Sequence, residues 1–313
     1  MHPDREEARK SIHVCMSKGG LSLAQVAERL GIPLFTLRQF SSAARYGDSE
    51  GEIMARKVLE GLKANPLPLP DLPGKLYETR ATKQMDALLE EVADGAWGIL
   101  YGPSGSQKSF LLESRGAEQA REPEPRIVYI RVSPSGMTPN VLLRRIAAAI
   151  GAPYAQYVDG MRQSILYTVR SRRQSVALVL DEADTLYQWL ETLETLRELG
   201  DLARARTGRV GIGILIAGNE RVWKIFEDRK SVYLEKWRAR VEQLGLRVIG
   251  PSESEGATML RGELGDLGQR RVEDVLESCA AQDPESKRRY INAHRLFNVI
   301  ARARKRGNGK AVN

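Results

Sequence analysis

The chain has 313 residues, 42% of them hydrophobic and 28% charged, with a net charge of +8, which suits about two soluble globular domains of ~150 residues each. Its two cysteines, Cys15 and Cys279, exclude a disulfide framework and a cysteine metal quartet and favour a reducing, cytoplasmic compartment. Because no apolar run reaches ~18 residues and the first residues lack an apolar signal core, neither a membrane span nor a secretion signal is expected.

A helix-turn-helix is predicted inside the first unit, residues 1–62. Apolar residues recur at helical spacing on both sides of Gly31 and Pro33, which can end one helix and open the next, and Ser22 can cap the first helix. The positions expected to face inward are Leu23, Val26, Ala27, Leu30, Leu34, Leu37 and Phe40. The outward positions of the second helix, which would face a DNA major groove, are Thr36, Arg38, Gln39 and Ser42.

The charge of this unit leaves a second interpretation open. Residues 1–50 hold seven basic and six acidic residues, so they lack the electrostatic footprint of a strong DNA-binding surface. The unit is therefore either a DNA contact or a small helical interaction module.

Four prolines within residues 64–74 mark an extended linker, placed at 63–74, because proline fixes φ and lacks a backbone donor. Residues 75–250 then alternate continuous apolar runs with helical patterns, such as the helix that Thr138 can cap and Pro139 can begin. Continuous apolar runs indicate strands buried on both faces. The pattern predicts an α/β domain with a mostly parallel five-stranded sheet. The expected strands lie within residues 97–102, 125–134, 175–184, 210–220 and 244–251.

The stretch GPSGSQKS follows the first expected strand and precedes an expected helix. It matches the phosphate-binding pattern G-x-x-x-x-G-K-[ST], except that Gln107 stands where glycine usually precedes the lysine. Backbone N–H groups of such a loop cradle phosphate oxygens, while Lys108 reaches the phosphates and Ser109 holds Mg²⁺. If φ of Gln107 is positive, its side chain costs on the order of 1 kcal/mol or more. The candidate nucleotide-binding residues of the loop are Gly102, Pro103, Ser104, Gly105, Ser106, Gln107, Lys108 and Ser109.

Two other expected strands also end in polar residues. Asp181 and Glu182 follow one apolar run, where Asp181 can bind Mg²⁺ and Glu182 can polarise an attacking water. Asn219 follows the next run and can orient water or contact the γ-phosphate. Ligands of parallel sheets bind beyond the carboxyl ends of the strands, so these residues are expected to gather at the glycine loop. The alternative for each is a solvated turn.

Arginines outside these motifs are candidates for contacts with neighbouring subunits or with DNA. Arg238 or Arg240 could act in trans on the nucleotide of an adjacent subunit, and Arg295 could fold back onto the phosphates. A cluster that could bind DNA phosphates consists of Arg170, Arg172 and Arg173. A solvated helix face is the alternative for the first pair and for the cluster.

Residues 251–313 are expected to form a helical lid with a basic end. From residue 287 onward the chain has nine Lys and Arg and no acidic residue, which leaves about −1 for the rest. Such an end suits a polyanion contact or a solvated tail. Its candidate DNA contacts are Arg302, Arg304, Lys305 and Arg306.

In this order the motifs resemble those of the AAA+ ATPases and, more narrowly, of the transposition target-selection ATPases typified by the B protein of phage Mu. The resemblance covers roughly residues 20–310 and rests on the stretches YETRATKQM, YGPSGSQKS, LVLDEAD, AGNERV and AHRLFNVIARA. It implies an ATP-binding homo-oligomer that forms helical filaments or rings on double-stranded DNA without strong sequence preference. It also implies a nucleoid-associated protein of a bacterium or phage that delivers DNA to a cognate transposase, which stimulates ATP hydrolysis.

The resemblance also implies roles at matching motif positions. Lys108 and Ser109 would be the phosphate and Mg²⁺ ligands. Asp181 would bind the metal and Glu182 would activate water. The sensing and trans positions are Asn219 as first sensor, Arg295 as second sensor and Arg240 as the trans arginine. The residues that approach the nucleotide base are Glu78, Thr79 and Lys83.

Two other functions fit the same motifs. One is a helix-turn-helix regulator or a replication-loader-type ATPase of the same superfamily. The other is a DNA-binding protein with a vestigial phosphate loop. The departure at Gln107 from the usual glycine is expected to affect ATP hydrolysis more than the fold. We therefore expect the protein to bind ATP and to hydrolyse it slowly in the absence of a partner.

Overall fold

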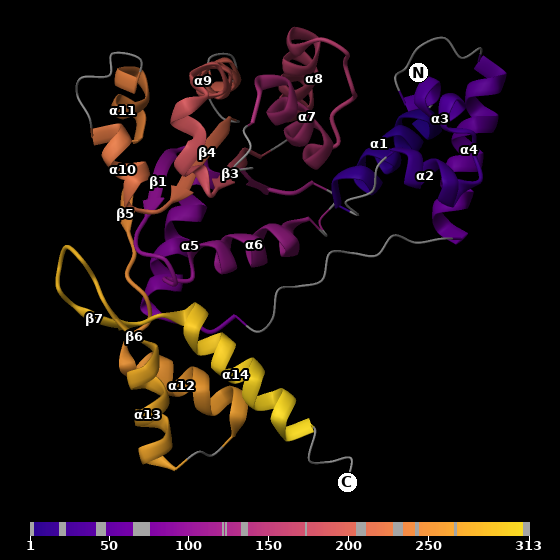
Figure 1. Ribbon diagram of the computed structural model, residues 1–313. Helices are drawn as coiled ribbons and strands as arrows, with labels where there is room; N and C mark the ends of the chain where they lie inside the picture. The colour runs from indigo at the N-terminus through magenta and orange to yellow at the C-terminus, as the bar shows by residue number, and fades with distance from the viewer. Residues whose placement is uncertain are drawn as a thin grey trace.

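Three units follow one another along the chain in the computed structural model (Figure 1): an N-terminal helical unit, a central α/β core and a C-terminal unit, which we call the lid. Each unit has its own cluster of buried apolar side chains. The structure describes residues 3–18, 23–41, 48–64, 76–120, 122, 124–132, 137–172, 174–204, 211–227, 234–241, 244–265 and 268–308. The expected proline linker falls almost wholly outside these residues, as do Ser22, Ser42 and Arg173.

The described residues of the N-terminal unit form the helices α1 (Pro3–Lys18), α2 (Leu23–Leu30), α3 (Leu34–Ser41) and α4 (Asp48–Ala64). Gly31, with a φ of 60°, ends α2, and the Ile32 N–H bonds to the Ala27 carbonyl at 2.9 Å, which is the bond of a Schellman ending. The expected inward positions are buried or partly buried except Leu34, which is 37% exposed. The expectation for Leu34 was wrong because it begins α3, where the turn at residues 31–33 leaves it outside the cluster.

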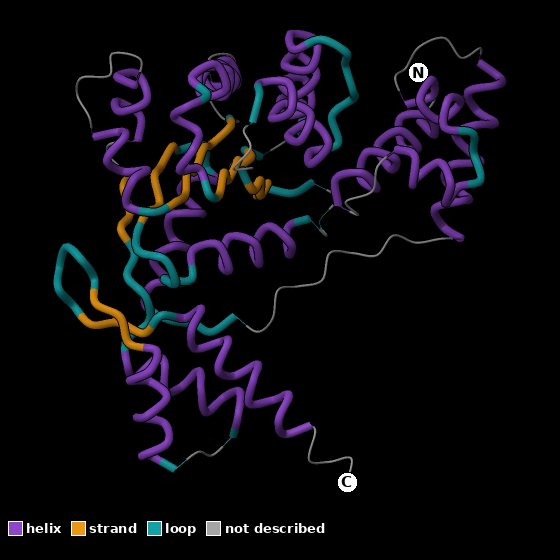
Figure 2. Tube along the Cα trace, viewed as in Figure 1, coloured by secondary structure: helices purple, strands orange, loops and turns teal. Residues whose placement is uncertain are grey.

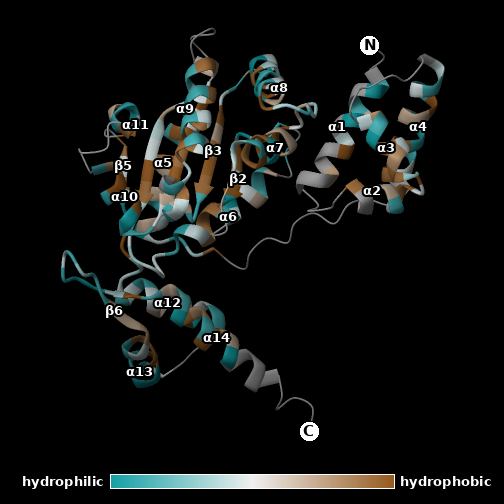
Figure 3. Ribbon diagram, turned by 45° about the horizontal axis from the view of Figure 1, so that its top comes forward, coloured by the Kyte–Doolittle hydropathy of each residue, from teal (hydrophilic) through white to brown (hydrophobic). Residues whose placement is uncertain are grey.

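The core is built on a parallel sheet with the strand order β2-β3-β4-β1-β5. Its strands are β1 (Trp97–Tyr101), β2 (Ile127–Arg131), β3 (Val176–Asp181), β4 (Ile212–Gly218) and β5 (Gly245–Arg247). Every residue of β3 and β4 is buried, as expected for strands covered on both faces; Figure 3 colours β3 brown along most of its length. The predicted α/β fold with a five-stranded parallel sheet is confirmed.

Helices cover both faces of this sheet. One face carries α5 (Arg80–Ala93) and α6 (Lys108–Gln119). The other carries α7 (Pro139–Ile150), α8 (Val158–Ser171), η1 (Ala183–Gln188), α9 (Leu190–Arg204), α10 (Glu220–Glu227) and α11 (Glu235–Val241). Thr138 caps α7 and Pro139 lies in its first turn, as expected. Helix α1 of the N-terminal unit lies against α7.

The lid contains α12 (Glu253–Leu264), α13 (Gln269–Cys279), β6 (Ala280–Gln282), β7 (Arg289–Ile291) and α14 (Ala293–Asn308). Strands β6 and β7 form an antiparallel hairpin, drawn in orange with a teal turn in Figure 2, which the sequence analysis did not expect. Ser252 caps α12 with a full capping box, next to residue 251, where the lid is expected to begin. Within the part of the chain that is described, no helix combines the length and the apolarity needed to cross a membrane.

Candidate nucleotide-binding site

The loop between β1 and α6 lies at the carboxyl end of the sheet, beside the last residues of β3 and β4. Gly102 has a φ of 150°, and a Cβ atom there would lie 2.0 Å from the carbonyl oxygen of Val248, so only glycine fits. The Ser106 hydroxyl donates to the Pro103 carbonyl at 2.9 Å and closes the loop. Helix α6 begins at Lys108, so the free N–H groups of its first turn face this loop.

The side chain of Lys108 folds back onto its own loop. Its Nζ donates to the carbonyl oxygens of Gly102 at 2.8 Å and Pro103 at 3.0 Å, and to the Ser106 hydroxyl at 2.9 Å. All three partners are uncharged, and the side chain is buried. Among the described residues, the ammonium therefore has hydrogen-bond acceptors but no directly bonded counter-ion.

Burial lowers the pKa of Lys108 to about 8, because the charged form loses its hydration. Three nearby carboxylates act in the opposite direction and raise this pKa, in decreasing order Asp181, Asp184 and Glu220. Asp181 ends β3, Asp184 follows in η1 and Glu220 begins α10 after β4, so acidic residues lie around the loop beyond the carboxyl ends of these two strands. A phosphate beside Lys108 would likewise favour its charged form.

Asp181 ends β3 and is 1% exposed. The Tyr129 hydroxyl on β2 donates to its Oδ2 at 3.0 Å, which fixes the orientation of the carboxylate. Burial raises the pKa of Tyr129, and the charge of Asp181 raises it further, so the phenol remains a donor at neutral pH. Ser109 is exposed on the first turn of α6.

A Mg²⁺ ion here would need ligands beyond the protein. Among the described residues, no group of three or more His, Cys, Asp or Glu side chains could hold a metal ion. Ser109 and Asp181 are the hydroxyl and carboxylate ligands typical of a phosphate loop, where phosphate and water oxygens complete the octahedron. The residues present therefore fit Mg²⁺ only together with a nucleotide.

Glu182 directly follows Asp181 and has a left-handed backbone, with φ 55° and ψ 35°. Its carboxylate is bound by the guanidinium of Arg131, the last residue of β2. The hydrogen bond and the charge of Glu182 raise the pKa of Arg131, so the guanidinium stays charged. In this conformation the candidate water-activating carboxylate is engaged by a cation.

Asn219 lies between β4 and α10. Its backbone N–H donates to Asp184 Oδ1 at 2.9 Å, and its side-chain oxygen accepts from the Arg221 N–H at 2.7 Å. The side-chain oxygen therefore caps α10, and the amide NH₂ is the end that would contact a phosphate or a water. The sequence analysis did not single out Asp184, whose only signal was its place as the last acid of LVLDEAD.

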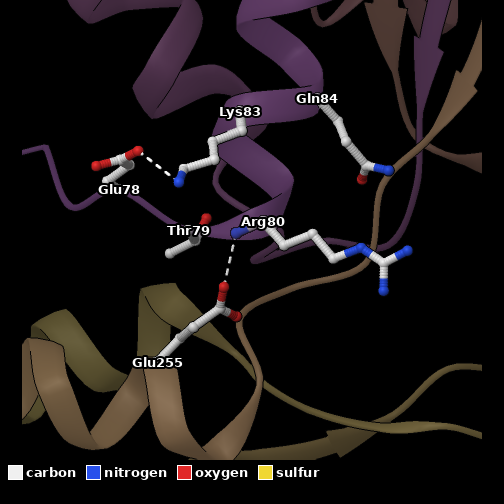
Figure 4. A pocket seen from close by; sticks show the side chains of 6 residues that line it. All are labelled: Glu78, Thr79, Arg80, Lys83, Gln84 and Glu255. Carbon is white, nitrogen blue, oxygen red and sulfur yellow. Dashed lines mark hydrogen bonds and ion pairs between the residues drawn. The ribbon is translucent and has the colours of Figure 1, made fainter.

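A pocket of about 390 Å³ lies between the core and the lid (Figure 4). It is lined by the residues that were expected to approach the nucleotide base. Its lining consists of Glu78, Thr79, Arg80, Lys83, Gln84 and Glu255. Glu78 and Lys83 form an exposed ion pair at 2.7 Å. The Arg80 backbone N–H donates to Glu255 Oε1 of the lid at 2.6 Å, so the pocket spans both units.

Thr79 connects this pocket to the phosphate loop. It caps α5 by accepting from the Thr82 N–H at 3.1 Å, and it is 2% exposed. Its hydroxyl also lies 3.4 Å from Gln107 Oε1, a long hydrogen bond. Residues 78–83, which we call the base-side segment, and the phosphate loop therefore meet at the side chains of Thr79 and Gln107.

Gln107 has a left-handed backbone, with φ 71° and ψ 3°, at the N-cap of α6. The condition under which a side chain is costly at this position is therefore met. Its side chain makes no capping bond and is 5% exposed, and its Nε2 has no hydrogen-bond partner among the described residues. A buried donor without an acceptor, beside a desolvated ammonium and a helix N-terminus, fits a bound anion.

The lid contacts the phosphate loop through residues that the sequence analysis missed. Asn292 Nδ2 donates to the Ser104 carbonyl at 3.2 Å, and the Ala293 N–H donates to the Gly105 carbonyl at 3.0 Å. Gly105 has a φ of 84°, and a Cβ atom there would lie 2.3 Å from Asn292 Oδ1. The signal was the asparagine that precedes α14, a helix-capping residue type.

Arg295 was expected to reach the phosphates from the lid. Its side chain is exposed, and its guanidinium donates to the Ala280 carbonyl at 3.4 Å; its backbone N–H bonds to Asn292 Oδ1 at 3.1 Å. In this conformation Asn292 and Ala293 make the bonds to the loop, one turn before Arg295.

Arg240 is engaged within its own chain. Its guanidinium donates through Nε and one Nη to the two carboxylate oxygens of Asp201, both at 3.0 Å, and lies 5.2 Å above the Trp97 ring. Arg238 lies partly exposed on the same helix, α11. A role of Arg240 in trans would require it to leave Asp201.

In the arginine cluster at the end of α8, Arg172 is buried and bonds to the backbone of its own chain. Arg172 is 7% exposed, and its guanidinium donates to the carbonyls of Pro125 at 3.0 Å and Ile150 at 2.7 Å. The expectation that Arg172 faces DNA is corrected, because burial turns its guanidinium inward. Arg170 donates to the Leu202 carbonyl at 2.9 Å and stays partly exposed.

The remaining DNA candidates lie on helix surfaces. On α3, Arg38 and Gln39 are exposed and Thr36 is partly exposed. On α14, Arg302 is exposed, and the same helix carries Arg304, Lys305 and Arg306. The structure thus provides two separated helices for a polyanion.

Comparison with known proteins identifies the fold of the core. Residues 93–226, from the end of α5 to α10, match the family model of an AAA domain. No curated protein matches the chain in sequence. The core has the fold of the AAA+ P-loop ATPases, and its phosphate loop, Asp181 and Asn219 lie inside the matched segment.

Solved structures resemble the chain over most of its length. The Cdc6p protein of Pyrobaculum aerophilum is 18% identical, with 76% of this chain and 65% of that chain covered and a TM-score of 0.54. The ORC1 protein of Aeropyrum pernix, solved in complex with DNA, is 18% identical, with 74% and 61% covered and a TM-score of 0.50. The chain therefore spans less than two thirds of either protein.

Proposed function

We propose that the protein is an ATP-dependent DNA-binding ATPase that assembles on duplex DNA and delivers it to a cognate transposase. The observation that carries the nucleotide part is the buried ammonium of Lys108, which donates hydrogen bonds to three uncharged oxygens in front of the first turn of α6. A bound phosphate would stabilise such a buried ammonium, because it would supply a negatively charged hydrogen-bond acceptor. The transposition part is supported by the motif resemblance, above all by the stretches YETRATKQM and AGNERV.

The positions of the side chains support the proposed catalytic roles. Lys108 would exchange loop carbonyls for phosphate oxygens, and Ser109 and Asp181 would hold Mg²⁺, which neutralises phosphate charge when bound. Glu182 would polarise water after release from Arg131, with Asn219 orienting the reacting groups. Basal hydrolysis is proposed to be slow, because Glu182 is paired and Gln107 departs from the usual loop.

The assembly part rests on charge and on shared sites. The basic end of α14 and the exposed face of α3 supply two DNA contacts. The slope of log affinity against log salt concentration should therefore be about −0.9 for each phosphate neutralised. Arg240 or Arg238 would complete the site of a neighbouring subunit. ATP would then favour the oligomer, because each nucleotide bridges two chains.

Imaging of the protein on duplex DNA, with and without ATP, tests the proposal. We expect ATP-dependent filaments or rings on the wild type and none on Lys108→Ala. DNA binding that is equal with and without ATP, or indifferent to salt, would argue against it.

A replication-loader-type ATPase is the second candidate, and the fold likeness to Cdc6p and ORC1 favours it. Adding a transposase or a replicative helicase to the protein on DNA separates the two, since the true partner should raise ATP turnover. A vestigial phosphate loop is the third candidate. It predicts no ATP binding even at millimolar concentration.

A further inference from the structure

Gln107 has two energetically unfavourable features, one in its backbone and one in its side chain. Its backbone is left-handed although it is not glycine, and its buried Nε2 lacks an acceptor among the described residues. Strained backbone and unpaired buried donors persist mainly where a function requires them. Glycine would remove both features, so the glutamine needs an explanation of its own.

The two ends of the amide have different surroundings. Oε1 accepts from the hydroxyl of Thr79, which is itself fixed by the capping box of α5. This contact holds the amide on the side of the loop that faces the base pocket, in which Thr79 is also a lining residue. The donor end, Nε2, lies at the opposite end of the amide, where it is buried and has no acceptor among the described residues.

We propose that Gln107 is a nucleotide-binding residue, whose Nε2 donates a hydrogen bond to an oxygen of the bound nucleotide while Oε1 keeps its bond to Thr79. This inference rests on the proposed function, since it requires a nucleotide at the loop. The acceptor is a phosphate or ribose oxygen. The side chain thus joins the phosphate loop to the base-side segment when the nucleotide is bound.

The competing explanation is that glutamine is merely tolerated. Both explanations predict that Gln107→Gly stabilises the protein without nucleotide, because the strain and the unpaired donor disappear. They differ in affinity: a tolerated glutamine leaves nucleotide binding unchanged or weaker than in Gln107→Gly. Our proposal requires stability and affinity to change in opposite directions.

Gln107→Glu sharpens the test. The substitution keeps the size, the left-handed backbone and an acceptor for Thr79, but it removes the donor and adds negative charge. Gln163→Glu, at an exposed position of α8, makes the same charge change away from the loop. We expect Gln107→Glu to weaken ADP and ATP binding by about tenfold or more, and Gln107→Gly by a smaller factor, while Gln163→Glu binds as the wild type does.

The experiment measures nucleotide dissociation constants by competition with a fluorescent nucleotide, together with thermal unfolding of each variant without nucleotide. Adenosine, AMP and ADP locate the acceptor. If the Gln107 variants already bind adenosine more weakly than the wild type does, the acceptor is a ribose oxygen. If the loss of affinity first appears with AMP, the acceptor is on the α-phosphate. If it first appears with ADP, the acceptor is on the β-phosphate.

The outcomes separate this inference from the proposed function. If the wild type binds no nucleotide, both are overturned. If the wild type binds nucleotide and Gln107→Gly binds it as tightly or more tightly, the inference alone is overturned, whatever the affinity of Gln107→Glu. Higher unfolding temperature with weaker binding in Gln107→Gly, and wild-type binding in Gln163→Glu, supports it.

Discussion

Arg131 at the end of β2 holds the carboxylate of Glu182 at the end of β3, one residue beyond the buried Asp181. The two strands are neighbours in the sheet, and their register pairs Arg131 with Asp181. The ion pair therefore engages the residue that is proposed to activate water. Its strength is limited, since Arg131 is 64% exposed.

Removing this cation should raise basal ATP turnover. We expect Arg131→Ala to increase this turnover by about 1.4- to fivefold, because an exposed ion pair contributes roughly 0.2–1 kcal/mol. Steady-state phosphate release measures the effect, and Glu182→Gln should abolish turnover in either background. The control is Arg144→Ala, which removes an arginine of α7 that stacks on Tyr154. A rate in Arg131→Ala at or below that of the wild type would contradict this role.

Nucleotide affinity should depend on pH through Lys108. Its pKa is about 8 in the protein without nucleotide, and a bound phosphate raises it. Affinity is therefore constant at pH values well below 8 and falls above 8, by up to about tenfold per pH unit until the raised pKa is reached. Binding above pH 8 should also take up a proton. Calorimetry in buffers of different ionisation enthalpy measures this uptake, and a pH-independent affinity from about pH 7 to 9 would refute the assignment.

The bond from Asn292 to the phosphate loop should slow nucleotide exchange. Asn292→Ala removes the donor to the Ser104 carbonyl and loosens the lid over the loop. We expect nucleotide dissociation to become about three- to tenfold faster, the effect of one hydrogen bond of ~1 kcal/mol. Stopped-flow displacement of a fluorescent nucleotide measures it. Asn298→Ala, at an exposed position of α14, should leave the rate unchanged.

Subunits should share active sites if Arg240 acts in trans. Arg240→Ala should bind nucleotide nearly as the wild type does but lose cooperative turnover. Because the substitution also removes the bond to Asp201, thermal unfolding must accompany the assay. Mixtures of Arg240→Ala and Glu182→Gln should regain part of the activity, since each supplies what the other lacks. Absence of rescue at every mixing ratio would move the test to Arg238.

The N-terminal unit should act as an accessory DNA contact. Its near-neutral charge predicts that removal of residues 1–62 weakens DNA binding without abolishing ATP-dependent assembly. Electron microscopy and salt-dependent binding of the shortened and full chains measure both effects. Because α1 lies against α7, circular dichroism of the shortened chain must first establish that the core remains folded. A folded core without filaments would make the unit part of the assembly interface.

The sequence by itself determined the sheet and the phosphate loop. Continuous apolar runs predict strands buried on both faces wherever they occur, and the spacing of Gly102, Gly105 and Lys108 is a local property of one turn. Because ligands bind at the carboxyl ends of parallel strands, the meeting of Asp181 and Asn219 with this loop also followed from the order of the runs.

Only the tertiary structure decided which polar side chains form hydrogen bonds or ion pairs within the protein. Arg172 reads as one of three surface arginines, yet the order of the strands and helices brings the carbonyls of Pro125 and Ile150 to its guanidinium and buries it. Asn292 and Arg131 carried no motif, because their partners, the phosphate loop and Glu182, are distant in the chain. Hydrophobic periodicity is a local signal, whereas a hydrogen bond between segments exists only after packing has set their distance.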